Sequence, residues 1–403
     1  MAKLDNTAFD AALKVYFTDE EVQDLSFRDH GAYGFIRKLT SFTGKTYEQP
    51  ITIGAVGGRS ATAGEAVNAK NPSTHKRFSI PMTRNYCFAD IDGLTLASSK
   101  SDRGAFMPAL TTEVASCFTQ YANDQAMMMY GSGTGLRGVV SAVAGAVITL
   151  TEIKDARNFE VGMTLEWATT ETGVTLASGS KVVAVDRGLG TITVDLISSI
   201  IATHFLFQLG DAPNNTGNKK LVGFDGWLPE TVPATAFFGV PDRTVDVDRL
   251  GRTLYDGTVA SDDEEEILVK GAAKLRANGG RPDIAFISEN RMANLDRLLE
   301  GRGRYEKTTS ADGKIGFSSI VVVSGGGEIR VIGDPWCPDD VGYMLTSRDW
   351  VLPSVGMAPR LLDDDNNRIL RATDDDAYEV RVGGYQALSC SAPGHSARLK
   401  FVP

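Results

Sequence analysis

The sequence predicts an α+β protein that combines a long helix, an extended two-stranded arm and a separate β-rich segment. Residues 105–130 have the apolar spacing of a helix, and residues 51–88 contain two extended runs around a long polar connection. Residues 142–210 consist of short alternating runs broken by Gly and Asp, which favours a small β-barrel or sandwich. At 403 residues the chain is long enough for two or three domains and a sizeable core.

Residues 1–45 contain too few apolar residues to build a core of their own. Asn6 is placed to cap a short helix that carries Phe9 and Leu13, and charged residues of both signs follow it. We expect this segment to lie along a surface, either of its own domain or of a neighbouring subunit.

The arm predicted over residues 51–88 needs a partner surface. Phe78, Ile80 and Met82 alternate along its second strand, which indicates one buried face. The connection between its strands is longer than twenty residues and rich in Gly, Ala, Ser and Asn, a length typical of functional or mobile loops. Because a two-stranded ribbon is marginal in water, we expect these three side chains to rest on another surface.

The clearest predicted helix covers residues 105–130. Pro108 falls in its first turn, where a missing N–H costs nothing, and Gly131 ends it. A helix of this length spans roughly 40 Å at ~1.5 Å per residue. Its apolar residues recur at steps of three and four: Met107, Leu110, Val114, Cys117, Tyr121 and Met128.

The β-rich segment contains a clear hairpin signal. Val183 and Val185 precede a turn of Asp, Arg and Gly residues, and Ile192 and Val194 follow it. The side chains expected to form the core of this segment are Val161, Met163, Leu165 and Trp167.

From residue 243 onward helices and strands alternate. Ser261 and Glu264 have capping-box spacing before one helix, and Ser288 is expected to cap the next helix after a buried strand at 283–287. Apolar residues of that second helix share one stripe: Met292, Leu295 and Leu299. Further strands are predicted at 320–323, 329–332 and 343–345, and the tail from Tyr378 alternates again.

The charge balance argues against a protein that grips nucleic acid over a broad surface. Lys plus Arg total 41 and Asp plus Glu total 51, which gives a net charge of −10. The start of the chain has Asp5 and Asp10 where a signal peptide needs apolar residues. No apolar run approaches the ~18 residues that a membrane span requires, so no membrane association is expected.

The residues that usually carry chemistry are scattered. The four histidines and four cysteines lack metal-ligand spacing, so we expect no metal site and no cofactor. No Ser/His/Asp or Cys/His arrangement can be read from spacing and GxSxG does not occur, so the chain is not expected to be an enzyme. We expect reduced, packed thiols rather than a disulfide framework at Cys87, Cys117, Cys337 and Cys390.

Three motifs have both a functional and a structural interpretation. GTGLRG at 133–138 matches a dinucleotide-binding pattern but follows a helix instead of a strand, so we interpret it as the end of that helix. Two acidic triplets, 363–365 and 374–376, resemble part of a calcium loop without its required Gly and are better explained as a solvated hairpin tip. The basic stretch 297–314 is an exposed loop or a charged intersubunit contact through Arg302, Arg304 and Lys307.

The order of these pieces resembles the major capsid protein of tailed bacteriophages, which has the Hong Kong 97-like fold. Residues 131–141 look like that family's Gly-rich exit from its spine helix, 282–305 like the strand, helix and loop of its axial domain, and 331–356 like its returning strands. The resemblance implies this division: an N-terminal arm at 1–45, an extended loop with flanking peripheral strands at 46–100, the spine helix at 101–141, an inserted β domain at 142–210, an axial domain with connecting segments at 211–350, and a return to the peripheral domain at 351–403.

The resemblance also implies a function and partners, and it implies that Phe78, Ile80 and Met82 are buried against an adjacent subunit. Subunits of this family assemble as hexamers and pentamers into an icosahedral shell around double-stranded DNA, which they contact weakly and without sequence preference. A separate scaffolding protein, a portal and decoration or cement proteins are the implied partners. The implied location is the virion capsid, assembled in the cytoplasm of the host bacterium.

Two other functions remain open at this point. An encapsulin-type nanocompartment shell shares the fold, although a long inserted β domain is not expected there. A cytoplasmic nucleotide-binding oxidoreductase would use GTGLRG and would be a monomer or small oligomer. The β-rich insertion is the feature that departs most from the family pattern, and we expect it to project outward or to brace a neighbouring subunit.

Overall fold

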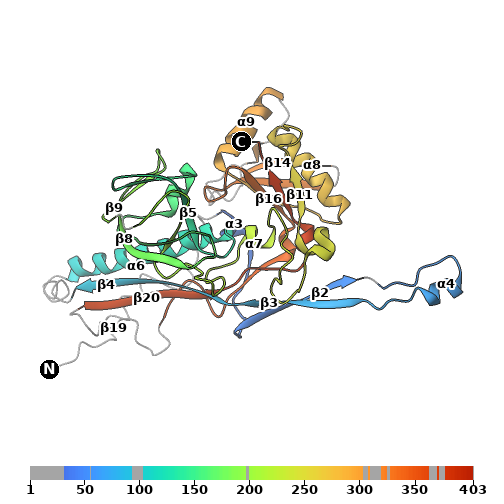
Figure 1. Cartoon of the computed structure of the whole chain (residues 1–403), viewed down its shortest axis with the longest axis horizontal. Helices are drawn as coiled ribbons and strands as arrows, with labels where there is room; N and C mark the ends of the chain where they lie inside the picture. Colours follow the sequence, from blue (N-terminus) through green and yellow to red (C-terminus); the bar gives the residue numbers. More distant parts are fainter. Residues whose placement is uncertain are drawn as a thin grey trace.

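The computed structural model shows an elongated molecule with a long arm on one side (Figure 1). The structure describes residues 31–54, 56–92, 103–196, 199–302, 307–308, 319–324, 327–362, 370–371 and 377–402; within these ranges it describes no side chains for 90–92, 103–113, 299–302, 307–308, 319, 324 and 377.

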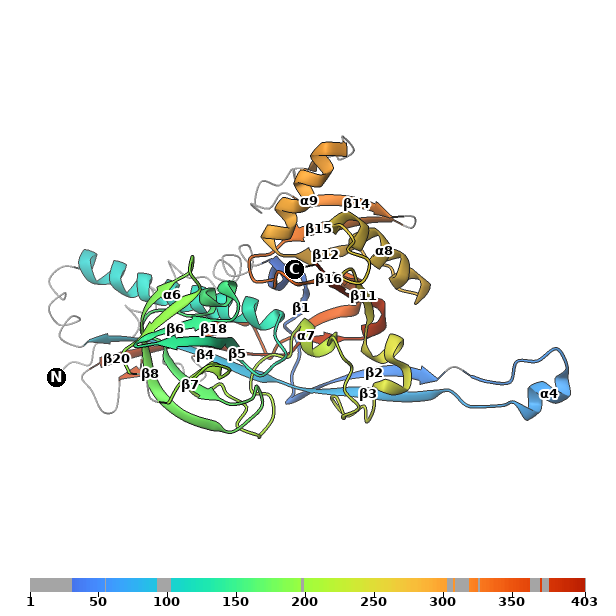
Figure 2. The same cartoon turned by 45° about the horizontal axis from the view of Figure 1, so that its top comes forward.

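The arm is a two-stranded antiparallel ribbon with a short helix at its tip. β2 (Thr46–Gly54) pairs with β3 (Thr74–Pro81), with Thr46 opposite Pro81 and Gln49 opposite Phe78. The tip carries α4 (Ala63–Asn68), and the outer part of the ribbon extends away from the rest of the molecule (Figures 1 and 2). The sequence prediction of two strands around a long connection is therefore confirmed.

The spine helix and a four-stranded sheet form the next layer. α6 (Arg103–Met129) matches the helix predicted over 105–130 and packs on β4 (Thr83–Asp92) and β20 (Ala377–Gln386). β20 is the centre of this sheet and pairs with β4 along its whole length, while β18 (Arg360–Leu361) and β19 (Leu370–Arg371) occupy its other edge. Val114, Cys117, Val380 and Val382 form the buried layer between helix and sheet.

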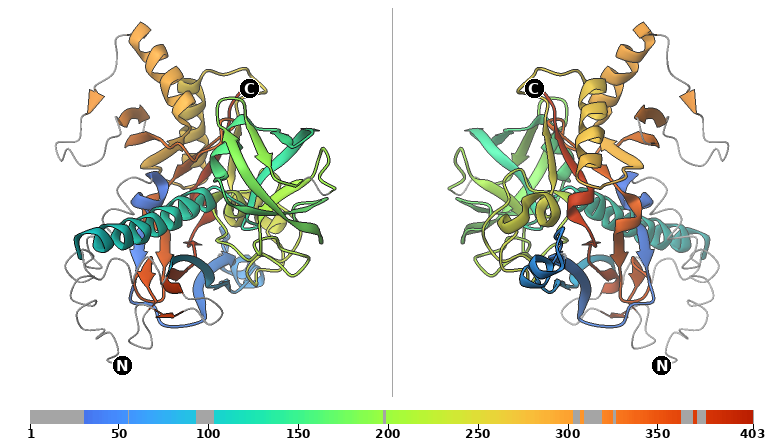
Figure 3. Two further views of the ribbon diagram at one scale, coloured as in Figure 1. Left: turned by 90° about the vertical axis from the view of Figure 1, so that its left-hand side faces the viewer. Right: turned by 90° about the vertical axis from the view of Figure 1, so that its right-hand side faces the viewer.

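Residues 136–208 form a closed six-stranded barrel beside α6 (Figure 3). Its strand order is β10-β5-β6-β9-β8-β7. The strands are β5 (Leu136–Ala144), β6 (Val147–Leu150), β7 (Thr164–Ala168), β8 (Thr175–Asp186), β9 (Thr191–Val194) and β10 (Phe205–Gln208).

The structure confirms the predicted β-rich segment as a barrel, but one of the four residues predicted for its core lies outside it. The hairpin around Asp186 joins β8 to β9, and the Asp186 carboxylate accepts hydrogen bonds from the N–H groups of Gly188 (2.9 Å) and Leu189 (3.0 Å). Leu165 and Trp167 are fully buried and Met163 packs against them. Val161 was expected in this core, but it lies in the turn before β7 and is 66% exposed.

A seven-stranded mixed sheet with two helices on one face makes up the upper part of the molecule (Figure 2). α8 (Glu264–Ala277) and α9 (Glu289–Arg302) cover one face through Leu275 and Leu295. In sheet order the strands are β11 (Thr253–Asp256), β22 (Ala397–Lys400), β16 (Val341–Leu345), β12 (Ile284–Ile287), β15 (Gly327–Gly333), β14 (Ser319–Ser324) and β13 (Lys307–Thr308).

The central core joins this sheet to the arm and to the spine helix. β1 (Arg37–Leu39), β17 (Trp350–Pro353) and β21 (Ser389–Cys390) form a three-stranded sheet beneath it, and α7 (Phe224–Trp227) packs inside. α3 (Gly31–Phe35) is held there because the buried Asp334 carboxylate accepts from Ala32 N–H and Tyr130 O–H, both at 2.8 Å. Gly31 is required at this contact, since a Cβ would lie 2.3 Å from that carboxylate.

One predicted cap forms and the other does not. Ser288 accepts a hydrogen bond from Arg291 N–H (3.3 Å) at the start of α9, as expected. The capping box of Ser261 and Glu264 is wrong, because α8 begins after Asp263. The Glu264 carboxylate instead pairs with Arg291 at 3.2 Å, which ties α8 to α9.

Candidate assembly surfaces

The base of the arm is part of the core of its own chain. Phe78 is fully buried, with its ring edge-on to Trp227 (5.1 Å between centroids) and Phe237 (6.3 Å). Ile80 is 2% exposed and Met82 packs against the same cluster. The expectation that Phe78 and Ile80 are buried by an adjacent subunit is therefore wrong.

Segment 223–240 is the reason for this difference. It brings several aromatic rings under the arm, and the Trp227 indole N–H donates to Leu388 O at 3.1 Å, which fixes its position. Ser79 N–H donates to Phe238 O at 2.7 Å, so the backbone of β3 is tied to the same segment. The alternation at 78–82 correctly indicated a buried face, but it did not say which part of the chain covers it.

The outer part of the arm has no core. None of the described residues between 51 and 77 is buried, although the ribbon and α4 are regular structure. The apolar side chains Val56 and Val67 are 63% and 55% exposed. The sequence interpretation missed these two residues because they lie in a connection that is otherwise polar. A ribbon with no fully buried side chain of its own is suited to resting on another surface.

A second exposed apolar surface lies on the sheet face turned away from α6. Tyr86 and Phe88 on β4 are 43% and 54% exposed, and Tyr385 on β20 completes a group of rings with centroids 6.1–6.3 Å apart. The Arg381 guanidinium lies 5.4 Å from the centre of the Phe88 ring. We call Tyr86, Phe88, Tyr385 and Arg381 the aromatic patch.

The barrel is held to the body by a buried cluster of charges. Lys220 Nζ lies 3.3 Å from the Asp124 carboxylate on α6 and 3.1 Å from Asp211, and Arg137 on β5 pairs with Asp124 as well. Asn85 on β4 donates to Asp124 at 2.8 Å. Burial opposes ionisation of Asp124, but the neighbouring Arg137 and Lys220 outweigh it and hold the pKa of Asp124 below its ordinary value.

A second contact fixes the barrel to the seven-stranded sheet. Lys154 Nζ, in a 3₁₀ turn of the barrel (Ile153–Asn158), donates to Asp339 Oδ1 and to Cys337 O, both at 2.7 Å. Arg157 donates to Pro335 O at 2.8 Å. Two separate sets of polar contacts, to α6 and to the loop between β15 and β16, hold the barrel against the rest of the chain.

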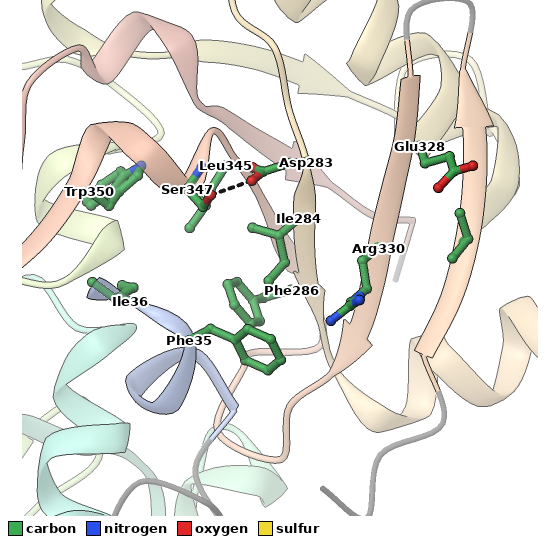
Figure 4. Close-up of a pocket in the computed structure, with 11 residues that line it drawn as sticks. Phe35, Ile36, Asp283, Ile284, Phe286, Glu328, Arg330, Leu345, Ser347 and Trp350 are labelled. Atoms are coloured by element: carbon green, nitrogen blue, oxygen red, sulfur yellow. Dashed lines mark hydrogen bonds between the residues drawn. The ribbon is translucent and has the colours of Figure 1, made fainter. Parts of the chain in front are cut away.

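Cavities of the described residues lie beside the seven-stranded sheet and beside the barrel. Figure 4 shows a pocket of about 360 Å³ between α3 and the seven-stranded sheet, where Ser347 N–H donates to Asp283 at 2.8 Å and Arg330 lies on β15. A groove of about 990 Å³ lies between β4 and the barrel. Among the residues that the structure describes, no group of three or more His, Cys, Asp or Glu side chains is placed to hold a metal ion.

The GTGLRG segment does not have the geometry of a dinucleotide site. It connects the end of α6 to the start of β5, which reverses the required order of strand and helix. Gly133 and Gly135 have φ of 95° and 78°, and a Cβ on Gly133 would lie 2.6 Å from Val222. The glycines are therefore needed for a tight turn that packs closely against segment 218–222 of the same chain.

Three further sequence predictions fall outside the described part of the chain. Arg304 and the two acidic triplets at 363–365 and 374–376 are not described, and neither are the side chains of Arg302 and Lys307. A charged intersubunit loop at 302–307 therefore stays a prediction. No helix in the described ranges is long and apolar enough to cross a bilayer.

Comparisons with known proteins identify the fold through structure. No protein-family model matches the sequence, and no curated protein sequence matches it. A capsid subunit of cyanophage A-1(L) is similar at 12% identity and a TM-score of 0.50, covering 94% of this chain and 93% of that chain. The chain has the fold of tailed-phage major capsid proteins.

Two further similar structures have lower scores. One is the capsid of a native GTA particle, with 10% identity, a TM-score of 0.46, and coverage of 91% of this chain and 89% of that one. The other is the holo-SrpI encapsulin of Synechococcus elongatus PCC 7942, with 10% identity, a TM-score of 0.44, and coverage of 99% and 96%.

Proposed function

We propose that this chain is the major capsid protein of a tailed bacteriophage. In this proposal it assembles as hexamers and pentamers into an icosahedral shell around double-stranded DNA, and its place is the virion capsid. The fold supports the proposal, because it is the fold of a cyanophage capsid subunit over nearly the whole length of both chains. The domain division expected from the sequence, with an arm, an extended loop, a spine helix and two main domains, is part of the same proposal.

The single observation that carries the proposal is the outer part of the arm. Between residues 51 and 77 the described strands and α4 contain no fully buried side chain, and Val56 and Val67 are more than half exposed. Ordering a ribbon costs conformational entropy that its own contacts cannot offset. A neighbouring subunit that covers both valines would contribute ~1.5–3 kcal/mol for each.

The proposed intersubunit contact therefore lies farther out on the arm than the sequence predicted, at Val56 and Val67 instead of Phe78 and Ile80. Phe78 and Ile80 anchor the arm, while Val56 and Val67 at its tip are free to bind another copy. The aromatic patch on β4 and β20 is the apolar surface of matching character on the body of the subunit. Weak contacts of this kind, repeated over many copies, close a shell through multivalency.

The remaining features are consistent with a structural role. The net charge of −10 suits a container that does not grip packaged DNA everywhere. A separate scaffolding protein, a portal, decoration proteins and assembly in the host cytoplasm belong to the proposal through the family resemblance alone. The protein is proposed to act without catalysis or a cofactor.

Sedimentation velocity and negative-stain microscopy of the purified full-length chain test the proposal. We expect capsomers or closed shells in addition to free subunits. A single stable species of 43 kDa under all assembly conditions would contradict it. Nuclease-protected double-stranded DNA in particles from infected cells would support a phage capsid, whereas particles that hold only protein cargo would point to an encapsulin-type compartment.

A further inference from the structure

Two cysteines that lie far apart in the sequence meet in the structure. Cys87 is on β4 and Cys117 is on α6, and their sulfur atoms are 2.9 Å apart. A disulfide bond is about 2.05 Å long, so only a small approach separates these thiols from a covalent bond. The sequence predicted reduced, packed thiols rather than disulfides, because nothing in the cysteine spacing shows that this strand faces this helix.

The two thiols are held on rigid elements. Cys87 lies opposite Val382 in the long pairing of β4 with β20, and its neighbour Ala89 is buried against α6. Val114 and Phe118 on α6 pack in the same cluster. The helix and the sheet are therefore already in the position that a cross-link between them would need.

The two thiols differ in access. Cys87 is half-buried and lines the groove of about 990 Å³ between β4 and the barrel, so a small molecule can reach it. Cys117 is 5% exposed and lies behind it. The hydrogen bond between Cys87 and Cys117 is the largest influence on the Cys87 thiol and lowers its pKa, against the effect of burial. Access to the groove makes Cys87 the first thiol to react, and its larger thiolate fraction adds to that reactivity.

We propose that Cys87 and Cys117 form a reversible disulfide that locks the spine helix α6 to β4 under oxidising conditions. The oxidant is a low-molecular-weight disulfide of the glutathione type. The Cys87 thiolate attacks one sulfur of this disulfide, which forms a mixed disulfide and releases one thiol. The Cys117 thiolate then attacks the Cys87 sulfur and releases the second thiol. The protein loses two protons and two electrons, and the oxidant is reduced to two thiols.

The other two cysteines provide an internal contrast. Cys337 and Cys390 are fully buried, and burial raises the pKa of both thiols well above the ordinary value. They are expected to stay reduced under the conditions that oxidise Cys87 and Cys117. Oxidation of this chain should therefore be selective for one pair.

Peptide mapping of the full-length protein tests the pairing. The reduced protein is treated with glutathione disulfide at pH 8, alkylated with N-ethylmaleimide under denaturing conditions, and digested without reductant. We expect two alkylated thiols, at Cys337 and Cys390, and one peptide pair that joins Cys87 to Cys117. Alkylation of all four thiols, or a cross-link that involves Cys337 or Cys390, would overturn the proposal.

Single substitutions test the order of attack. Cys117→Ser should leave a stable glutathione adduct on Cys87, because no second thiol remains to displace it. Cys87→Ser should react many times more slowly, because Cys117 is shielded from the groove. Cys337→Ser is the matched control and should give the wild-type cross-link. Equal adduct formation in both single variants would contradict the assigned roles.

Thermal unfolding with and without dithiothreitol tests the lock itself. Reduction should lower the unfolding temperature of the oxidised wild type by several degrees and leave Cys87→Ser unchanged. An oxidised protein with the midpoint of the reduced one would overturn the locking role. The tests do not depend on assembly, so a chain that stays monomeric but forms this disulfide would refute the proposed function and leave this inference standing.

Discussion

Replacing Phe78 with alanine tests whether the base of the arm belongs to the core of its own chain. Phe78 is fully buried and makes edge-on contacts with Trp227 and Phe237. A buried Phe→Ala substitution costs ~3–5 kcal/mol through lost burial and the remaining cavity. Each aromatic contact accounts for ~0.5–1.5 kcal/mol beyond area burial. We therefore expect a loss of about 4 kcal/mol from the free energy of unfolding of the isolated subunit.

Urea unfolding of dissociated subunits, followed by tryptophan fluorescence, measures this loss. Trp227 and Trp350 lie in the same core, with ring centroids 6.2 Å apart, so the signal reports its unfolding. Val67→Ala is the matched control, because Val67 is 55% exposed and its substitution should change subunit stability by no more than ~0.5 kcal/mol. A Phe78→Ala subunit that unfolds like wild type but no longer assembles would refute the reasoning and restore Phe78 as an intersubunit contact.

Three further substitutions have defined outcomes. Val67→Glu should leave the free energy of subunit unfolding unchanged and raise the protein concentration needed for assembly at least tenfold, since a loss of ~1.4 kcal/mol per contact is enough for that factor. Light scattering measures the assembly concentration. A variant that assembles at the wild-type concentration would argue against a contact at the arm tip. Lys220→Met should lower the free energy of unfolding by ~3–5 kcal/mol, because the carboxylates of Asp124 and Asp211 lose a buried partner. A variant as stable as wild type in urea unfolding would show that this buried charge cluster does not hold the barrel. Asp155→Asn should be more stable than wild type at pH 8. Burial, together with Glu152 and Asp340, raises the pKa of Asp155 to about 7 from its model-compound value of 3.8. Between these values the folded state keeps a proton that the unfolded chain has released, so wild-type stability falls with pH by up to ~1.4 kcal/mol per unit. Parallel pH profiles for wild type and variant would contradict this assignment.

Local patterns in the sequence predicted individual elements well. The apolar spacing of residues 105–130 matches α6 within two residues at the start and one at the end, and the buried run at 283–287 matches β12. The hairpin at Asp186 forms with the expected turn. Residues that are neighbours in the sequence determine these features: apolar periodicity predicts the helix and the strand, and Gly and Asp predict the turn.

Contacts between distant segments could not be predicted in the same way. The alternation of Phe78 and Ile80 shows that one face of β3 is buried, but only the folded chain shows that segment 223–240 covers it. Likewise, only the folded chain shows that Cys87 on β4 lies beside Cys117 on α6. Ser261 and Glu264 match a capping pattern, yet the ion pair of Glu264 with Arg291 brings that carboxylate to the second helix. In all three cases, the partner of the side chain comes from a distant segment, which local sequence patterns do not identify.

The fixed position of the barrel limits what this β-rich segment can do. Its contacts reach α6 through Asp124 and the seven-stranded sheet through Asp339, so two separate parts of the subunit hold it. A barrel placed in this way presents the same outer surface on every copy of the chain. In the proposed capsid, this outer surface would be suited either to a contact with a neighbouring subunit or to a binding site for a decoration protein.

Amide hydrogen exchange over residues 56–77, compared between free subunits and assembled particles, tests the central claim most directly. The account predicts fast exchange at the arm tip in free subunits and strong protection after assembly, with the base of the arm at Phe78 and Ile80 protected in both states. Equal exchange at the tip in both states would contradict it, because the outer arm would then have no partner in the particle.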